Sequence, residues 1–71
     1  MPVVYIDAPP GLRADAKKKM MEKITSAIDD AYHIGETLVF LREHAPDNVA
    51  MNGLIQSANP KIAEILKKIS G

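Results

Sequence analysis

Two short apolar runs, residues 3–6 and 38–41, lie on either side of one long segment with helical periodicity. Each run is continuous rather than alternating, which is typical of a strand covered on both faces, as in a parallel sheet. A strand, a long helix and a second strand form a β-α-β unit with parallel strands and a right-handed crossover. We therefore predict an α/β (α+β) fold built on one such unit.

The crossover helix is expected from Ala14 to about His33. Asp15 lies in its first turn, where the helix dipole favours an anion, and Gly35 is a plausible stop just past its end. Six apolar residues recur at spacings of three and four and predict one buried stripe: Ala16, Met20, Ile24, Ala27, Ile28 and Ala31.

The rest of the chain is expected to be loop followed by a second helix. Residues 8–11 break regular structure because they contain two prolines and a glycine, and residues 46–48 are turn-forming. Residues 49–51 are a candidate for a very short strand. Asn59 and Pro60 are a typical cap and first position of a helix, whose apolar face would be Ile62, Ile65, Leu66 and Ile69.

A chain of 71 residues is long enough for one domain, residues 1–71, with a thin core. Two strands alone leave open sheet edges and do not make a stable sheet. Cysteine is absent, so disulfides cannot stabilise the fold, and His33 and His44 are too isolated to suggest a metal site. Self-association remains as the means of stabilisation, and we predict a homo-oligomer.

The charge pattern argues against nucleic acid and membranes as partners. Nine basic and nine acidic residues give a formal net charge of zero, whereas both partners favour a strongly basic protein. The basic run at residues 17–19 has acidic neighbours and is interpreted as a solvated helix face. Neither a secretory signal nor a membrane-spanning run is recognisable, and we expect a cytoplasmic protein.

Pro2 is the residue with the strongest chemical implication. Methionine aminopeptidase accepts small second residues, so removal of Met1 would leave Pro2 as the N-terminus with a secondary amine. An apolar strand follows at once, and desolvation there would lower the pKa of the amine towards neutrality. A neutral amine near pH 7 can act as a general base. The alternative is structural, since proline readily starts an edge strand.

The wider pattern resembles the 4-oxalocrotonate tautomerase family. The resemblance rests on the opening residues 1–6, on Gly11 before the long helix, on the strand that ends at residues 39–43, and on the loop 48–53. It spans roughly residues 2–57. It implies a hexamer of β-α-β subunits or a related assembly, with Pro2 as catalytic base and no cofactor. Family members move a proton between oxygen and carbon of 2-hydroxydienoates and enol acids.

The resemblance is uneven at the other site positions. Leu12 occupies the place of the family's first arginine, and Arg13 follows it, pointing either to the substrate or to solvent. Leu38 occupies the place of the second arginine. Arg42 shares a strand face with Leu38, about 13 Å away, and would bind substrate or pair with an acidic residue at an interface. Val49 replaces the usual pocket aromatic. The resulting pocket is less cationic than two arginines would make it.

Three functional hypotheses follow from this resemblance. The first is a tautomerase in which Pro2 is the base and Arg13, with or without Arg42, orients a substrate carboxylate. The second is a relative that hydrates or dehalogenates unsaturated acids with protonated Pro2 as an acid. The third is a non-catalytic oligomeric binding module. Tyr5 and Asp7 share one strand face, with Tyr5 interpreted as packing, and His44 is interpreted as a surface loop residue.

Overall fold

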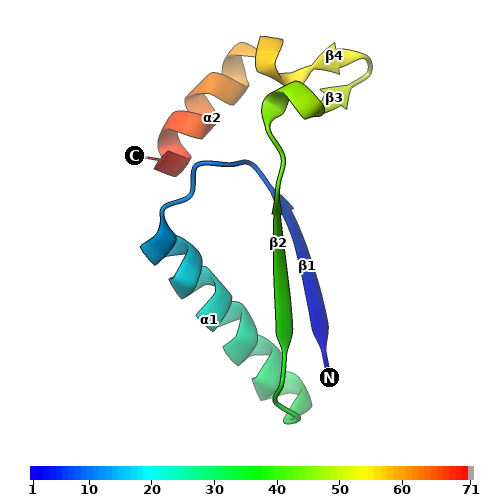
Figure 1. Cartoon of the computed structure of the whole chain (residues 1–71), viewed down its shortest axis with the longest axis vertical. Helices are drawn as coiled ribbons and strands as arrows, with labels where there is room; N and C mark the ends of the chain where they lie inside the picture. The colour runs from blue at the N-terminus through cyan, green and yellow to red at the C-terminus, as the bar shows by residue number, and fades with distance from the viewer. Residues whose placement is uncertain (71) are drawn as a thin grey trace.

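The computed structural model describes residues 1–70 and has the predicted β-α-β unit at its centre (Figure 1). Strand β1 (Val3–Ala8) pairs in parallel with β2 (Leu38–Glu43), and helix α1 (Ala14–Tyr32) connects them. The register runs from Val3 opposite Leu38 to Ala8 opposite Glu43. The fold class predicted from the sequence is confirmed.

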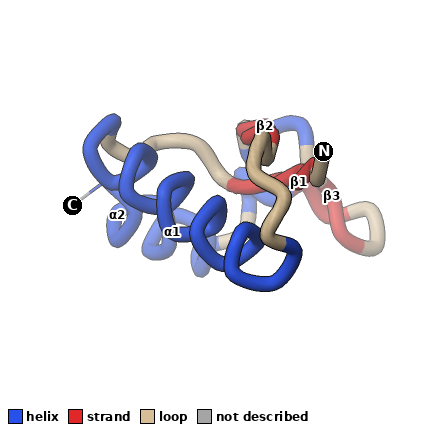
Figure 2. The backbone as a smooth tube through the Cα atoms, turned by 90° about the horizontal axis from the view of Figure 1, so that it is seen from below, coloured by secondary structure: helices blue, strands red, loops and turns tan. Residues whose placement is uncertain are grey.

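Only one face of this two-stranded sheet is covered. Along both strands burial alternates, and the half-buried residues are Val4, Ile6, Ala8, Val39 and Leu41. Both helices lie on the same side of the strands (Figure 2). The expectation that both strand faces would be covered is therefore wrong for the single chain, because α1 can cover one face only.

The uncovered face carries three cross-strand pairs, here called the outer ladder: Val3–Leu38, Tyr5–Phe40 and Asp7–Arg42. The rings of Tyr5 and Phe40 stack at a centroid distance of 5.3 Å, yet Tyr5 remains 62% exposed and Phe40 45% exposed. Aromatic pairs of this kind normally contribute by removing apolar area from water. The side chains of the outer ladder therefore contact one another across the two strands, but no other element within residues 1–70 covers them.

Helix α1 is fastened mainly to β2. Lys17 Nζ lies 3.0 Å from Glu43 Oε1, and the hydroxyl of Thr37 donates to Asp29 Oδ1 at 2.9 Å. Of the predicted apolar stripe, Ala27 and Ala31 are exposed, whereas the other four residues are half-buried. Two further residues, Met21 and Thr25, share the half-buried side.

The linker from α1 to β2 turns through three left-handed residues. His33 (φ 56°) ends the helix and donates its backbone N–H to Asp29 O at 2.8 Å, so the stop lies two residues before the expected Gly35. Gly35 (φ 77°) and Glu36 (φ 54°) follow. Such angles cost a non-glycine residue of the order of 1 kcal/mol or more, so this linker is a strained and specific turn.

The C-terminal part lies beyond the carboxyl ends of β1 and β2 (Figure 1). It contains the 3₁₀ turns η1 (Pro46–Asn48) and η2 (Gln56–Ala58), strands β3 (Ala50–Met51) and β4 (Leu54–Ile55), and helix α2 (Pro60–Ser70). The predicted start of the last helix is confirmed, since Asn59 Oδ1 accepts from the backbone N–H of Lys61 at 3.0 Å.

Strands β3 and β4 form a small hairpin around Asn52 and Gly53. Both turn residues have positive φ, 51° and 82°, which matches the Asn-Gly preference of type I′ turns. The sequence analysis expected no second strand after residue 51, although this dipeptide is a strong hairpin signal. Its meaning was missed because each strand has only two residues.

The single chain has almost no core. Among residues 1–70 no apolar side chain is buried, and Gln56 is the only buried residue. The radius of gyration is 14.9 Å, whereas a compact chain of this length would have about 11 Å. The exposed surface is 5457 Å², against about 4,300 Å² expected for a compact monomer of this mass. The single chain is thus extended and has a large exposed surface, and self-association stays a prediction.

We expect sedimentation at micromolar concentration to show particles of several subunits. Phe40→Asp should dissociate them, because it removes an aromatic contribution of about 1.5–3 kcal/mol per subunit and places a charge on the outer ladder. Lys23→Glu, a charge change on an exposed position of α1, is the matched control and should leave the particle unchanged. A well-folded wild-type monomer would contradict this architecture.

Candidate functional site

Pro2 lies at the start of β1 and is fixed by the neighbouring strand. Its backbone carbonyl accepts a hydrogen bond from the N–H of Leu38 at 3.0 Å, which extends the β1–β2 pairing by one residue. The structure therefore brings Leu38, one of the sequence-predicted site residues, beside Pro2. Because Leu38 is apolar, this neighbour supplies no positive charge to a substrate bound at Pro2.

A pocket of about 370 Å³ surrounds Pro2 at this end of the molecule. Its other lining residues are Met1, Val3, Val4, Ile28, Tyr32 and Ile34. The phenol of Tyr32 is the one polar side chain among them. It comes from the end of α1, and the sequence analysis did not single it out because nothing in the helix pattern indicates what a terminal residue faces. The surroundings of Pro2 are otherwise apolar, as expected.

Arg13 lies far from Pro2 within the same chain. It occupies the N-cap of α1, whereas Pro2 shares its pocket with Tyr32 at the other end of that helix. The 19 residues of α1 separate the two ends by about 28 Å. The Arg13 side chain is 65% exposed, with its Nε 3.7 Å from Asp15 Oδ1. Within one chain, Arg13 and Pro2 cannot contact the same small substrate.

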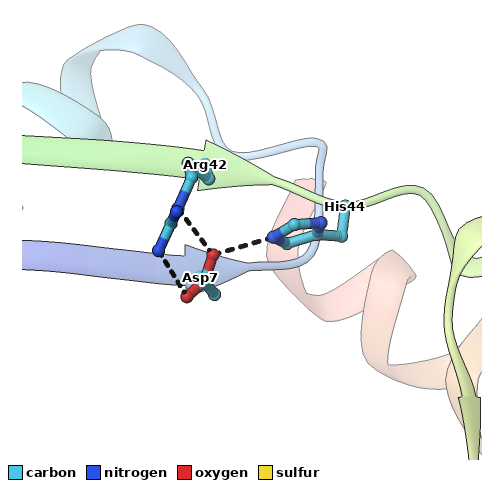
Figure 3. Close-up of polar contacts among 3 residues, drawn as sticks. All are labelled: Asp7, Arg42 and His44. Atoms are coloured by element: carbon cyan, nitrogen blue, oxygen red, sulfur yellow. Dashed lines mark hydrogen bonds and ion pairs between the residues drawn. The ribbon is translucent and has the colours of Figure 1, made fainter.

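Arg42 belongs to a polar cluster at the carboxyl ends of the strands, here called the strand-end cluster: Asp7, Arg42 and His44 (Figure 3). Arg42 binds Asp7 with two nitrogens, Nε to Oδ1 at 2.9 Å and Nη2 to Oδ2 at 3.1 Å. His44 Nε2 lies 2.8 Å from Asp7 Oδ1. The Arg42 guanidinium also lies 5.2 Å from the centroid of the Tyr5 ring. The ion-pair alternative for Arg42 is therefore present in the single chain.

The strand-end cluster holds Asp7 in its ionised form. The hydrogen bond from His44, and next the charge of Arg42, lower the pKa of the Asp7 carboxyl below its ordinary value of 3.8. Partial desolvation opposes this shift without reversing it. A carboxylate with three short contacts is thus a fixed negative charge at neutral pH.

Val49 lies near the same end, in a second pocket of about 450 Å³ here called the hairpin pocket. This pocket is bounded by the end of β1, the turn η1, strand β3 and the start of α2. Its lining residues are Asp7, Ala8, Pro9, His44, Pro46, Val49, Ala50, Met51, Gln56 and Ile62. All are uncharged apart from Asp7 and His44.

Apart from Arg13 at the start of α1, the sequence-predicted site residues thus fall into two groups within one chain. Pro2 and Leu38 lie at one end of the β1–β2 pair, and Arg42 lies at the other, with Val49 in the pocket beyond it. The residue opposite Arg42 is Asp7, five residues along β1 from Pro2 and about 16 Å away at the rise of a strand. A site that uses both groups requires more than one copy of the chain.

The grouping of Asp7 with Arg42 and His44 was not predicted. The sequence pattern places Asp7 on a strand face with Tyr5 and places His44 just after the second strand, but it gives no pairing register. The register sets Asp7 directly opposite Arg42, and His44 donates its backbone N–H to Ala8 O at 2.9 Å, which continues the pairing. Alternation alone cannot supply this information, because it fixes faces and not partners.

Other classes of site are not seen in the described part of the chain. Within residues 1–70 no three acidic, histidine or cysteine side chains gather in a way that could hold a metal ion. No helix in this range is both long and apolar enough to cross a membrane.

A protein-family model described as Tautomerase enzyme matches residues 2–59 of the chain. The chain belongs to the tautomerase family. The match begins at Pro2 and extends from β1 to the residue before α2, and so includes both ends of the strand pair. No curated protein and no solved structure matches the chain. Membership of this family supports a tautomerase-type, isomerase activity.

The lowered pKa of Asp7 predicts how the fold responds to acid. Its ionised form is the one stabilised by folding, so its contribution is full above about pH 4 and is lost as pH falls through the lowered pKa. We expect Asp7→Asn to lower the melting temperature at neutral pH. The difference from wild type should shrink below pH 4 in thermal melts at fixed protein concentration. A difference that does not change with pH would mean that the charge of Asp7 contributes nothing.

Proposed function

We propose that the chain is a cofactor-independent, cytoplasmic tautomerase that acts on 2-hydroxydienoate or enol-acid substrates, as 4-oxalocrotonate tautomerases do. The observation that carries this proposal is the family match that begins at Pro2, the residue just before β1, which lines a mostly apolar pocket. In this proposal Pro2 is the general base, and its secondary amine becomes available once Met1 is removed.

The amine of Pro2 moves one proton in two steps. As the neutral amine it takes the proton from the 2-hydroxyl of the enol, which leaves a conjugated enolate. The protonated amine then gives that proton to a carbon of the conjugated system, and the ketone forms with the amine regenerated. Apolar neighbours disfavour the charged amine, so the base is neutral near pH 7.

Assembly of several copies would bring the two groups of site residues together. Among residues 1–70 neither the outer edge of β1 nor that of β2 has a neighbouring strand. A two-fold axis that pairs β1 with β1 of a second copy makes the two strands antiparallel. The start of one strand, with Pro2, then lies at the same end as the strand-end cluster of the other. A hexamer or related homo-oligomer would repeat this arrangement.

The substrate carboxylate needs a positive group in the assembled site. Arg13 is exposed and makes one long contact, to Asp15. Its guanidinium could therefore bind the carboxylate of a substrate that lies at Pro2 of a second copy. Arg42 already gives two nitrogens to Asp7, which leaves less of its fork for a carboxylate. Leu38 and Val49 would form apolar walls against the conjugated chain of the substrate.

The mature protein should ketonise 2-hydroxymuconate or phenylenolpyruvate, with a rate that rises towards neutral pH as Pro2 loses its proton. Blocking the amine, by alkylation or by retention of Met1, should abolish turnover because no free base remains. Ultraviolet absorbance follows loss of the enol, and an intact mass shows whether Met1 is present.

Pro2→Ala is the control for this experiment. It leaves a primary amine in nearly the same place, so activity should fall without vanishing. Sedimentation should show the same oligomer for the mature, blocked and Pro2→Ala proteins. If the blocked oligomer turns over these enols as fast as the mature one, Pro2 is structural and the proposed mechanism is wrong.

The two arginines should differ in their contribution to turnover. Arg13→Ala should lower kcat/KM for an acidic substrate more than Arg42→Ala, because Arg42 is already paired. The loss of one charge-assisted contact corresponds to roughly 1.5–3 kcal/mol. Kinetics on both variants, each checked for oligomeric state, measure this difference. Equally small effects would show that neither arginine binds the substrate.

A further inference from the structure

The hairpin pocket has the size and composition of a small-molecule site. Its volume of about 450 Å³ is within the range of about 300–1,000 Å³ usual for ligand pockets. Most of its wall is apolar, with Val49, Met51 and Ile62 among the larger side chains. The two ionisable groups, Asp7 and His44, lie at one corner. A ligand with a flat apolar body and one polar end fits this division.

His44 is oriented at that corner by Asp7. Its Nε2 lies 2.8 Å from Asp7 Oδ1, and because the Asp7 carboxylate is ionised, this nitrogen carries the hydrogen. Nδ1 makes no hydrogen bond to any group within residues 1–70, and the His44 side chain is 46% exposed. In the imidazolium form Nδ1 is a donor, and Asp7 balances part of the added charge.

The charges near the pocket favour an anion when His44 is protonated. Asp7 and Arg42 cancel one another as a bidentate pair, so the imidazolium leaves the strand-end cluster with one net positive charge. No other charged group lines the pocket. Arg42 and a protonated His44 share the single negative charge of Asp7, so one positive charge stays without a carboxylate of its own.

We propose that the hairpin pocket binds a small unsaturated carboxylic acid, with the His44 imidazolium donating from Nδ1 to the carboxylate. Asp7 is the positioning residue that orients the ring. The class of ligand rests on the proposed function. The choice of His44 rests on its place in the hairpin pocket and its contact with Asp7, not on the family resemblance. His44 thereby supplies a positive group to a chain that has Leu12 and Leu38 in place of the family arginines.

This proposal is tested by measuring the binding of a carboxylic acid to protein that cannot turn over substrate. Protein with alkylated Pro2 is titrated with trans-cinnamate, an apolar ring joined to an unsaturated acid, between about pH 5 and 8, where histidine gains its proton. Affinity should rise about tenfold towards pH 5, the effect of one charge-assisted hydrogen bond. Uncharged cinnamamide should bind more weakly and show no such rise.

Two substitutions assign the effect to one histidine. His44→Gln keeps an amide donor but gains no charge, so its affinity for cinnamate should stay flat across the same pH range. His33→Asn is the matched control at the end of α1, where asparagine tolerates the left-handed backbone, and it should keep the wild-type profile. Wild-type NMR spectra should show cinnamate moving the His44 ring signals and leaving those of His33 in place.

Asp7→Asn tests the positioning role. It removes the carboxylate that fixes the ring, so the rise in cinnamate affinity towards pH 5 should be smaller than in wild type. An unchanged profile would overturn the part assigned to Asp7. If His44→Gln binds cinnamate with the wild-type affinity and pH profile, or if only the His33 signals move, the pocket assignment is wrong. That result leaves the enol turnover of mature protein untouched, so the two proposals fail separately.

Discussion

The parallel pairing of β1 with β2 fixes the relative positions of Pro2, Leu38, Asp7 and Arg42. It places Val3 opposite Leu38 at one end and Asp7 opposite Arg42 near the other. The first pair lies next to Pro2 and fixes the start of β1. The second pair forms the strand-end cluster together with His44. Side chains of one strand alternate between faces, so the same register decides which residues meet α1 and which form the outer ladder.

One-sided cover links this architecture to function. A chain with a single crossover helix can bury one sheet face, and the stacked Tyr5–Phe40 pair remains open on the other. The two ends of the strand pair also differ in character, with Pro2 in a mostly apolar pocket at one end and a charged cluster beside a second pocket at the other. A symmetric, antiparallel pairing of two copies would place the start of β1 of one copy beside the end of β1 of the other.

The sequence was sufficient for the β-α-β unit and the start of α2, but not for the β3–β4 hairpin and only partly for the candidate site. Apolar runs and helical periodicity predicted β1, α1 and β2, and Asn59 predicted the start of α2. The prediction that Ala27 and Ala31 lie on the buried side of α1 was wrong. The spacing of apolar residues along a helix does not indicate where the sheet beside it ends. His44 does lie in the exposed loop after β2, as interpreted, but its contact with Asp7 was missed because that contact depends on register and on the path after β2. Only three-dimensional pairing reveals such contacts.

The left-handed linker between α1 and β2 has a consequence for how this chain can vary. His33, Gly35 and Glu36 turn the chain by a fixed amount, and the length of the linker sets which residue of β2 meets Val3. One inserted or deleted residue here would slide β2 by one position and exchange its two faces. Phe40 would then turn towards α1 and Val39 outward. We therefore expect insertions and deletions in this linker to be tolerated far less well than changes of residue type.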